Sequence, residues 1–251
     1  MHSFMPNVLK SIAMVKMELR NVFYVSYTTS AKRIKNLLPP NLQLSLIDND
    51  TAFISLVILT CHGVHISAVP FIYFTYSQIN IRTYVVDPLT GQQSVYFLKS
   101  AVSSPLISFI TRSIGLLWEY VPISVGFVHA GNSEGLLHSI GGDWSGNFSV
   151  EVEETSDQLE KFVPFKDLEQ GINFLVRPLI GLYGTEGNVG RFKIWHPPIM
   201  PKCARLKSIK FPLLNKMEVI DTGCMVMPHS VLCVSNAQFT IFLPPEKIRN
   251  I

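Results

Sequence analysis

Residues 77–85 read Ser-Gln-Ile-Asn-Ile-Arg-Thr-Tyr-Val, and this stretch decides the fold class because polar and apolar side chains alternate along it. Side chains on a β-strand point alternately to its two faces. Gln78, Asn80 and Arg82 therefore share one face, and the two isoleucines share the other. If the apolar face packs on the core, the polar row faces either solvent or a wet cavity. Both alternatives are open at this point.

The polar row has the chemistry of a binding site. The guanidinium group of Arg82 offers a planar fork of donors that suits a carboxylate. The side-chain amides of Asn80 and Gln78 can each donate and accept hydrogen bonds. We therefore predict Gln78, Asn80 and Arg82 as ligand-binding residues for a small oxygen-rich or anionic compound. The alternative is an exposed sheet face with no ligand.

Further strands flank the polar row on both sides. The turn at residues 87–91 predicts a hairpin with a returning strand over 93–101. Ser103-Ser104-Pro105 predicts the start of a helix that runs to about residue 117. Residues 22–27, 42–47 and 52–59 are predicted strands, and most of the chain after residue 123 shows the same pattern. Strands joined by hairpins indicate an α+β, β-rich fold: a mostly antiparallel sheet closed into a barrel, with a few packed helices.

Composition narrows the functional classes. Of 251 residues, 47% are hydrophobic and only 16% are charged, so either the core is large or an apolar cavity is lined from within. The net charge of +3 and the lack of a dense basic patch argue against a nucleic-acid partner. The apolar stretch at 52–74 is interrupted by histidines and Pro70, and falls short of the ~20 residues of a membrane-spanning helix. We expect no membrane partner.

Residues 1–19 are predicted to form an N-terminal arm or short helix, and residues 20–251 a single domain. Charged residues interrupt any signal-peptide pattern near the start. The four cysteines (Cys61, Cys203, Cys224 and Cys233) form no Cys-x-x-Cys pair, so we interpret them as reduced thiols of a cytoplasmic protein. We expect no metal and no cofactor.

Several ordered segments resemble a known family. They are Leu37-Leu38-Pro39-Pro40, residues 78–85, Gly190-Arg191-Phe192 leading to His196-Pro197-Pro198, and Pro228-His229-Ser230. In order and spacing these resemble the YqjF-like uncharacterised family of the acetoacetate decarboxylase-like superfamily, over residues 22–248. The resemblance implies a β-rich barrel or cone around a closed pocket for a small molecule.

The resemblance does not extend to the decarboxylase machinery. The founding enzyme of the superfamily forms a Schiff base with a lysine whose pKa is depressed by a second, adjacent lysine. The matching stretch here is Tyr120-Val121-Pro122, so Ile123 and Ser124 occupy the two lysine positions. The pocket glutamate of the superfamily is matched by Gln78, which cannot act as a base. Lys99, on the neighbouring strand, is the replacement nucleophile to consider.

Two further residues are candidates for catalysis. Glu119 lies where the pocket segment of the superfamily begins, and His196 ends a strand inside a resembling segment. The prediction is an enzyme that acts on a small carbonyl or carboxylate compound without a Schiff-base lysine. The alternative is a non-catalytic binding protein for a small apolar or amphipathic metabolite. A weaker third alternative is an interaction module, and an oligomer is compatible with the sequence.

Overall fold

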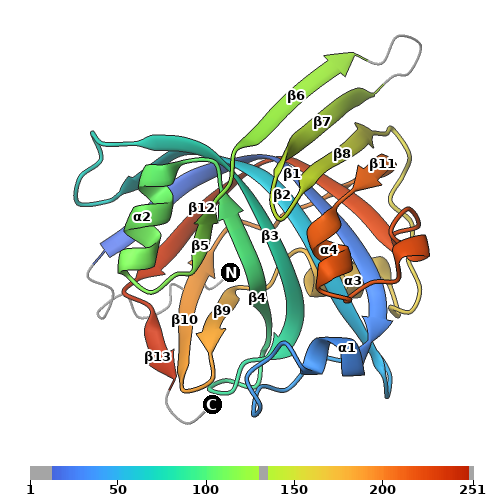
Figure 1. The fold of residues 1–251 in the computed structure, drawn as a ribbon, viewed down its shortest axis with the longest axis horizontal. Helices are drawn as coiled ribbons and strands as arrows, with labels where there is room; N and C mark the ends of the chain where they lie inside the picture. Colours follow the sequence, from blue (N-terminus) through green and yellow to red (C-terminus); the bar gives the residue numbers. More distant parts are fainter. Residues whose placement is uncertain (1–12, 130–134, 249–251) are drawn as a thin grey trace, which may run out of the picture.

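The computed structural model describes residues 13–129 and 135–248, and strands dominate it (Figure 1). The strands are β1 (Ala13–Ser30), β2 (Thr51–Ile66), β3 (Phe74–Val86), β4 (Gln93–Val102), β5 (Trp118–Tyr120), β6 (Ile123–His129), β7 (Leu136–Asp143), β8 (Asn147–Glu154), β9 (Ile180–Thr185), β10 (Asn188–Trp195), β11 (Lys202–Lys210), β12 (Ser230–Leu243) and β13 (Glu246–Ile248). The α-helices are α1 (Ala31–Lys35), α2 (Pro105–Ser113), α3 (Leu168–Leu175) and α4 (Pro212–Lys216). The predicted β-rich, mostly antiparallel fold is confirmed.

Part of the sheet closes into a ring of strands in the order β1, β2, β3, β4, β9, β10 and β12. Ile194 of β10 pairs with Ile241 of β12 and closes the ring. Neighbours in the ring are antiparallel except β4 and β9. From β12 the sheet continues through β11, β8, β7 and β6 as a second layer against the outside of the ring. A closed ring leaves few unpaired strand edges and encloses an interior.

The alternation in β3 divides the molecule into two cores. Ile79 and Ile81 point out of the ring and pack with the second layer. Tyr76 and Tyr84 point inward and join a separate apolar cluster, to which α3 also contributes. Gln78, Asn80 and Arg82 lie on this inward face, so the polar row belongs to the ring interior.

β1 corrects the expectation for the start of the chain. Residues 13–19, predicted as part of an arm or short helix, are strand, while residues 1–12 lie outside the described part. Met17 and Leu19 point into the ring, and so do Val22 and Tyr24. The inward positions change from odd to even numbers because β1 bulges against β2 at Asn21, whose φ is 50°. The shift breaks the single period that would have marked residues 13–30 as one continuous strand.

Other elements differ modestly from the predictions. The helix predicted to reach residue 117 ends at Ser113. The strand predicted at 42–47 is reduced to one bridge, between Leu44 and Val85. Within the described residues, no helix is both long enough and apolar enough to span a membrane.

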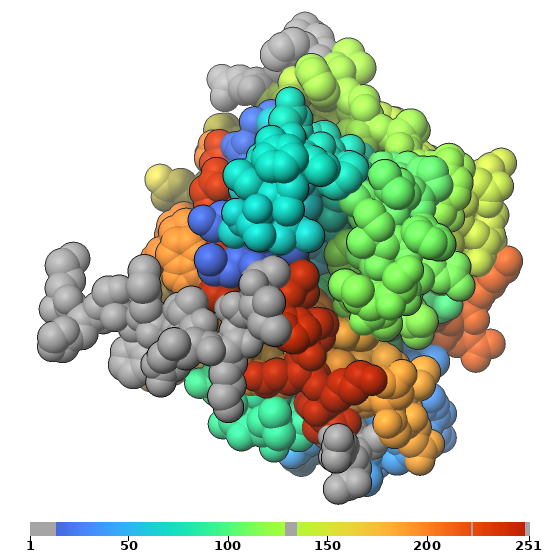
Figure 2. Space-filling model, turned by 90° about the vertical axis from the view of Figure 1, so that its left-hand side faces the viewer, coloured from blue at the N-terminus to red at the C-terminus, as the bar shows by residue number. Residues whose placement is uncertain are grey.

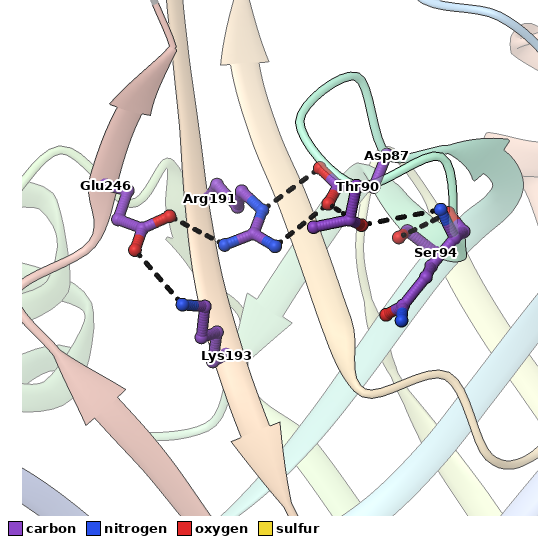
Figure 3. A network of polar contacts seen from close by, with 7 residues as sticks. Asp87, Thr90, Ser94, Arg191, Lys193 and Glu246 are labelled. Carbon is purple, nitrogen blue, oxygen red and sulfur yellow. Dashed lines mark hydrogen bonds and ion pairs between the residues drawn. The ribbon is translucent and has the colours of Figure 1, made fainter. Parts of the chain in front are cut away.

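A buried ion network fastens the β3–β4 turn to the strands beside it (Figure 3). Arg191 of β10 donates to both carboxylate oxygens of Asp87, at 3.0 and 2.9 Å. Its remaining nitrogen contacts Glu246 of β13 at 2.6 Å. Thr90 donates to Asp87 from within the turn. These contacts hold the end of the ring that lies away from α2.

Candidate functional site

The interior of the ring holds a cavity of about 90 Å³. Its wall takes side chains from β1, β2, β3, β4, β10 and β12, and from the segment after α3. Most of the wall is apolar, while Gln78, Asn80 and Arg82 supply a polar strip. All three residues of the predicted polar row therefore lie at one cavity, and the alternative of an exposed sheet face is wrong.

The two amides of the polar row are linked. The side-chain nitrogen of Gln78 donates to the side-chain oxygen of Asn80 at 2.9 Å, and both residues are buried. The Cys61 thiol donates to the Gln78 oxygen at 3.5 Å. This chain of contacts fixes the orientation of both amides. The Asn80 amide nitrogen keeps its donor capacity for a ligand.

Arg82 lies where α3 ends. Its Nη2 donates to the Leu175 carbonyl oxygen at 2.7 Å, and the Tyr84 hydroxyl donates to the same oxygen at 3.0 Å. The guanidinium carbon lies 5.2 Å from the centre of the Tyr24 ring. Nε is buried and has no hydrogen-bond partner, and no carboxylate in the described residues lies within ion-pair distance of Arg82. A partly buried cation without an anion favours an anionic ligand.

Two tyrosines and a cysteine of the cavity wall resist ionisation because they are buried. Burial raises the pKa of Tyr24 to about 12, although the positive charge of Arg82 opposes this shift. Burial likewise raises the pKa of the Cys61 thiol to about 12, and that of Tyr76 well above its ordinary value. The described residues of the wall include no lysine. At neutral pH, Arg82 therefore supplies the charge of the wall.

His196 lies behind the wall rather than in it. Its ring stacks on Phe239, a wall residue, at 4.8 Å between centroids. Nδ1 lies 2.8 Å from the Pro197 carbonyl oxygen, which only accepts, so Nδ1 carries the proton of the neutral ring. Nε2 is buried and has no partner. Burial lowers the pKa of His196, the Pro197 carbonyl raises it, and Arg177 and Arg82 lower it further, with a net decrease.

Glu119 is not at the cavity. It forms an ion pair with Lys99 at 3.1 Å and accepts a hydrogen bond from the Trp144 indole at 3.1 Å. Both Glu119 and Lys99 line another cleft, of about 420 Å³, which lies between the part of β4 that pairs with β5 and the part that pairs with β9. The structure therefore brings together Gln78, Asn80 and Arg82, sets His196 nearby, and separates Glu119 from them. In the described part of the chain no metal-ligand cluster occurs.

Residues 16–238 match the DUF2071 family, described as "Uncharacterized conserved protein (COG2071)". The chain belongs to this family. No curated protein matches the sequence. The fold of this DUF2071 chain is similar to that of three solved proteins with 8–12% identity, which shows likeness of fold alone.

The three structures are acetoacetate decarboxylase-like proteins or share their fold. The enduracididine biosynthesis enzyme MppR has a TM-score of 0.59 at 12% identity, with 96% of this chain and 91% of that chain covered. An acetoacetate decarboxylase-like enzyme from Sphingomonas wittichii RW1 has a TM-score of 0.57 at 10% identity, with 99% of both chains covered. Acetoacetate decarboxylase from Legionella pneumophila has a TM-score of 0.56 at 8% identity, with 93% of this chain and 86% of that chain covered. The predicted acetoacetate decarboxylase-like fold is thereby confirmed for this DUF2071 chain.

Sequence reasoning missed most of the cavity wall. Tyr24, Tyr76, Phe97 and Phe239 come from four strands that only ring closure brings together. Tyr76 shares the even-numbered face of β3 with the polar row, so the alternation contained that signal. Nothing local marks the other three residues, or the Leu175 carbonyl that holds Arg82.

Proposed function

We propose that the ring cavity binds a small carboxylate-bearing compound, with Arg82 as the anion anchor and Asn80 and Gln78 as orienting residues. The observation that supports this most directly is the unpartnered Nε of Arg82 beside a cavity whose described wall residues include no carboxylate. Nη2 is already fixed by Leu175, so the guanidinium group is oriented before a ligand arrives. MppR, a protein of similar fold, has been solved in complex with pyruvate.

The chemistry in this proposal involves no lysine imine. The described wall residues lack a lysine, and Lys99 is engaged by Glu119 in the other cleft. The wall tyrosines and Cys61 stay protonated at neutral pH because burial raises their pKa values. Binding without covalent chemistry is therefore the function that the geometry supports best.

An enzyme is the second candidate, and His196 favours it. Its unpartnered Nε2 is an acceptor on a ring that its lowered pKa keeps neutral near pH 7. A rotation of Phe239 would be needed to expose His196 to the cavity, because Phe239 belongs to the wall and stacks on the histidine ring. Proton transfer to or from a carbonyl compound held by Arg82 is the reaction that this arrangement suits.

Calorimetric titration with pyruvate, acetoacetate and butanoate tests the proposed function. We expect binding that is lost in Arg82→Gln and retained in Arg33→Gln, a matched arginine on the exposed helix α1. The melting temperature of Arg82→Gln must stay near that of the wild type for the comparison to hold, and Arg82→Lys serves as a second variant. Absence of binding to all three acids, or equal binding by Arg82→Gln, would refute the proposal.

Borohydride reduction in the presence of pyruvate or acetoacetate tests the absence of an imine. A Schiff base would be trapped as a stable secondary amine and would increase the intact mass of the protein. We expect no mass increase. A trapped adduct on any lysine would show that the chain has replaced the missing pair with another nucleophile.

A further inference from the structure

A second hollow, almost wholly apolar, lies at the end of the ring beside α2. It has a volume of about 380 Å³, and we call it the vestibule; its side chains include Ile66, Ile72, Phe74, Ile110, Ile114 and Leu243. In Figure 2, α2 and the loop between β2 and β3 stand on the two sides of this hollow. The hydroxyl of Thr111, one of its few polar lining groups, is turned to backbone carbonyls of α2.

The vestibule adjoins the cavity that holds the polar row. Five side chains line both spaces: Met17, Tyr76, Trp118, Phe192 and Ile241. The inward face of β3 runs from one space to the other, with Phe74 in the vestibule, Tyr76 at the junction and Arg82 at the far end. From Tyr76 to Arg82 the strand rises roughly 20 Å. The two spaces therefore lie end to end, with apolar side chains at the mouth and Arg82 at the far end.

Exposed isoleucines at the mouth of the vestibule carry an unfavourable hydration free energy unless a ligand or partner covers them. Ile72 is 50% exposed, Ile110 42% and Ile114 48%, and all three face the same hollow. Apolar side chains that gather around a hollow mark a binding surface for an apolar group. An occupant that spans the vestibule and the adjoining cavity would place a hydrocarbon at the mouth and an anion at Arg82.

We propose that the carboxylate ligand is a straight-chain fatty acid, whose carboxylate binds Arg82 and whose hydrocarbon tail runs past Tyr76 and Trp118 into the vestibule. This inference rests on the proposed function, because the same arginine binds the head group. It goes beyond it in assigning the vestibule to the tail. A small keto acid would leave the vestibule empty, and a neutral hydrocarbon would leave Arg82 without a counter-ion.

Chain length is the variable that tests the tail site. The probes are butanoate, octanoate and hexadecanoate, each titrated calorimetrically below its micelle-forming concentration. Each methylene buried in an apolar site tightens binding by about fourfold, so hexadecanoate should bind far more tightly than butanoate. Butanoate is too short to reach from Arg82 to the vestibule, so it reports on the head site alone.

Two neighbouring residues of α2 supply the matched variants. Ile110 lines the vestibule and is exposed enough to accept a charged side chain without unfolding the helix. Phe109 is 69% exposed and lies outside the lining. Ile110→Glu should weaken hexadecanoate binding by about tenfold or more and leave butanoate binding unchanged. Phe109→Glu should leave both acids unchanged, and Ile114→Glu should repeat the effect of Ile110→Glu.

The outcomes separate this inference from the proposed function. Butanoate binding with no gain in affinity for hexadecanoate would overturn the tail site and leave the head site standing. Hexadecanoate binding that is unaffected by Arg82→Gln would overturn the assigned orientation. If neither acid binds, the proposed function fails and the tail site fails with it. A gain with chain length that Ile110→Glu removes and Phe109→Glu preserves supports the fatty acid.

Discussion

Arg191 and Asp87 form a two-point ion pair in which both side chains are almost completely hidden from solvent, at 2% and 0% exposure. The pair links β10 to the β3–β4 turn, two segments that are far apart in sequence (Figure 3). Removal of one partner from such a pair leaves a buried charge without compensation.

Asp87→Ala should therefore lower the free energy of unfolding by about 3–5 kcal/mol. Glu246, the other partner of Arg191, is 49% exposed, so Glu246→Gln should cost less than about 1 kcal/mol. Urea denaturation of the two variants measures the contrast. Equal losses of unfolding free energy in the two variants would show that the buried Asp87 and the exposed Glu246 contribute equally to stability.

The Asp87 carboxylate should also make the protein less stable in acid. Burial raises the pKa of Asp87, but hydrogen bonds from Arg191 and Thr90 outweigh it, so the folded-state pKa lies below the ordinary 3.8. A carboxylate with a depressed folded-state pKa stabilises the protein above its unfolded pKa, and this contribution is lost as pH falls through the folded value. The urea midpoint of the wild type should therefore drop below about pH 4 more steeply than that of Asp87→Asn. Parallel curves would contradict this assignment.

His196 should stay neutral at pH 7 in the folded protein. Burial lowers its pKa first, and the charges of Arg177 and Arg82 lower it further, against the opposing effect of the Pro197 carbonyl. In an NMR titration its ring should change charge below the ordinary value of 6.5. Arg82→Gln should raise this pKa because it removes a nearby positive charge, and Arg33→Gln should not. An unchanged titration in Arg82→Gln would place His196 out of electrostatic reach of the cavity.

Cys61 should be inert to alkylation in the folded protein. It is 1% exposed, and burial raises its pKa to about 12, so the reactive thiolate is scarce and inaccessible. Cys224 is exposed and provides the internal control. Brief iodoacetamide treatment followed by peptide mass spectrometry should find Cys224 modified and Cys61 intact. Rapid modification of Cys61 would show that the cavity opens to solvent.

Asn21 should be replaceable by glycine but not by a β-branched residue. Its φ of 50° lies in the left-handed region, which costs most side chains about 1–2 kcal/mol. Asn21→Val should lower the unfolding free energy by about that amount or more, while Asn21→Gly should stay close to wild type. Thermal denaturation compares the two. A neutral Asn21→Val would mean that the β1 bulge can relax.

The sequence predicted the fold where the strand period was clean. In β3 and β4 the alternation and the turn at residues 87–91 were sufficient, and the hairpin was confirmed. In β1 the bulge at Asn21 moves the inward positions from odd to even, so residues 13–19, predicted as arm or helix, do not share one period with the predicted strand at 22–27. A bulge is a single irregular residue with no fixed sequence mark.

Only part of the candidate site was predicted, because only part of it lies on a strand with a clean alternation. The polar row occupies one strand, so local alternation brought its residues together. The partners of Arg82 could not be predicted, because the Leu175 carbonyl belongs to the end of α3, some ninety positions along the chain. Glu119 was proposed from its place in the chain, yet its strand β5 pairs alongside β4 and directs its side chain to Lys99.

Alternate residues of β3 serve two different structural roles. Odd-numbered positions such as Ile79 and Ile81 hold the two layers together, and even-numbered positions such as Gln78, Asn80 and Arg82 line the ring interior. Because neighbours along the strand never share a task, a substitution at an even position leaves the interlayer packing intact. Natural selection can therefore change what the pocket accepts by single codon changes in one short segment, without first having to rebuild the scaffold.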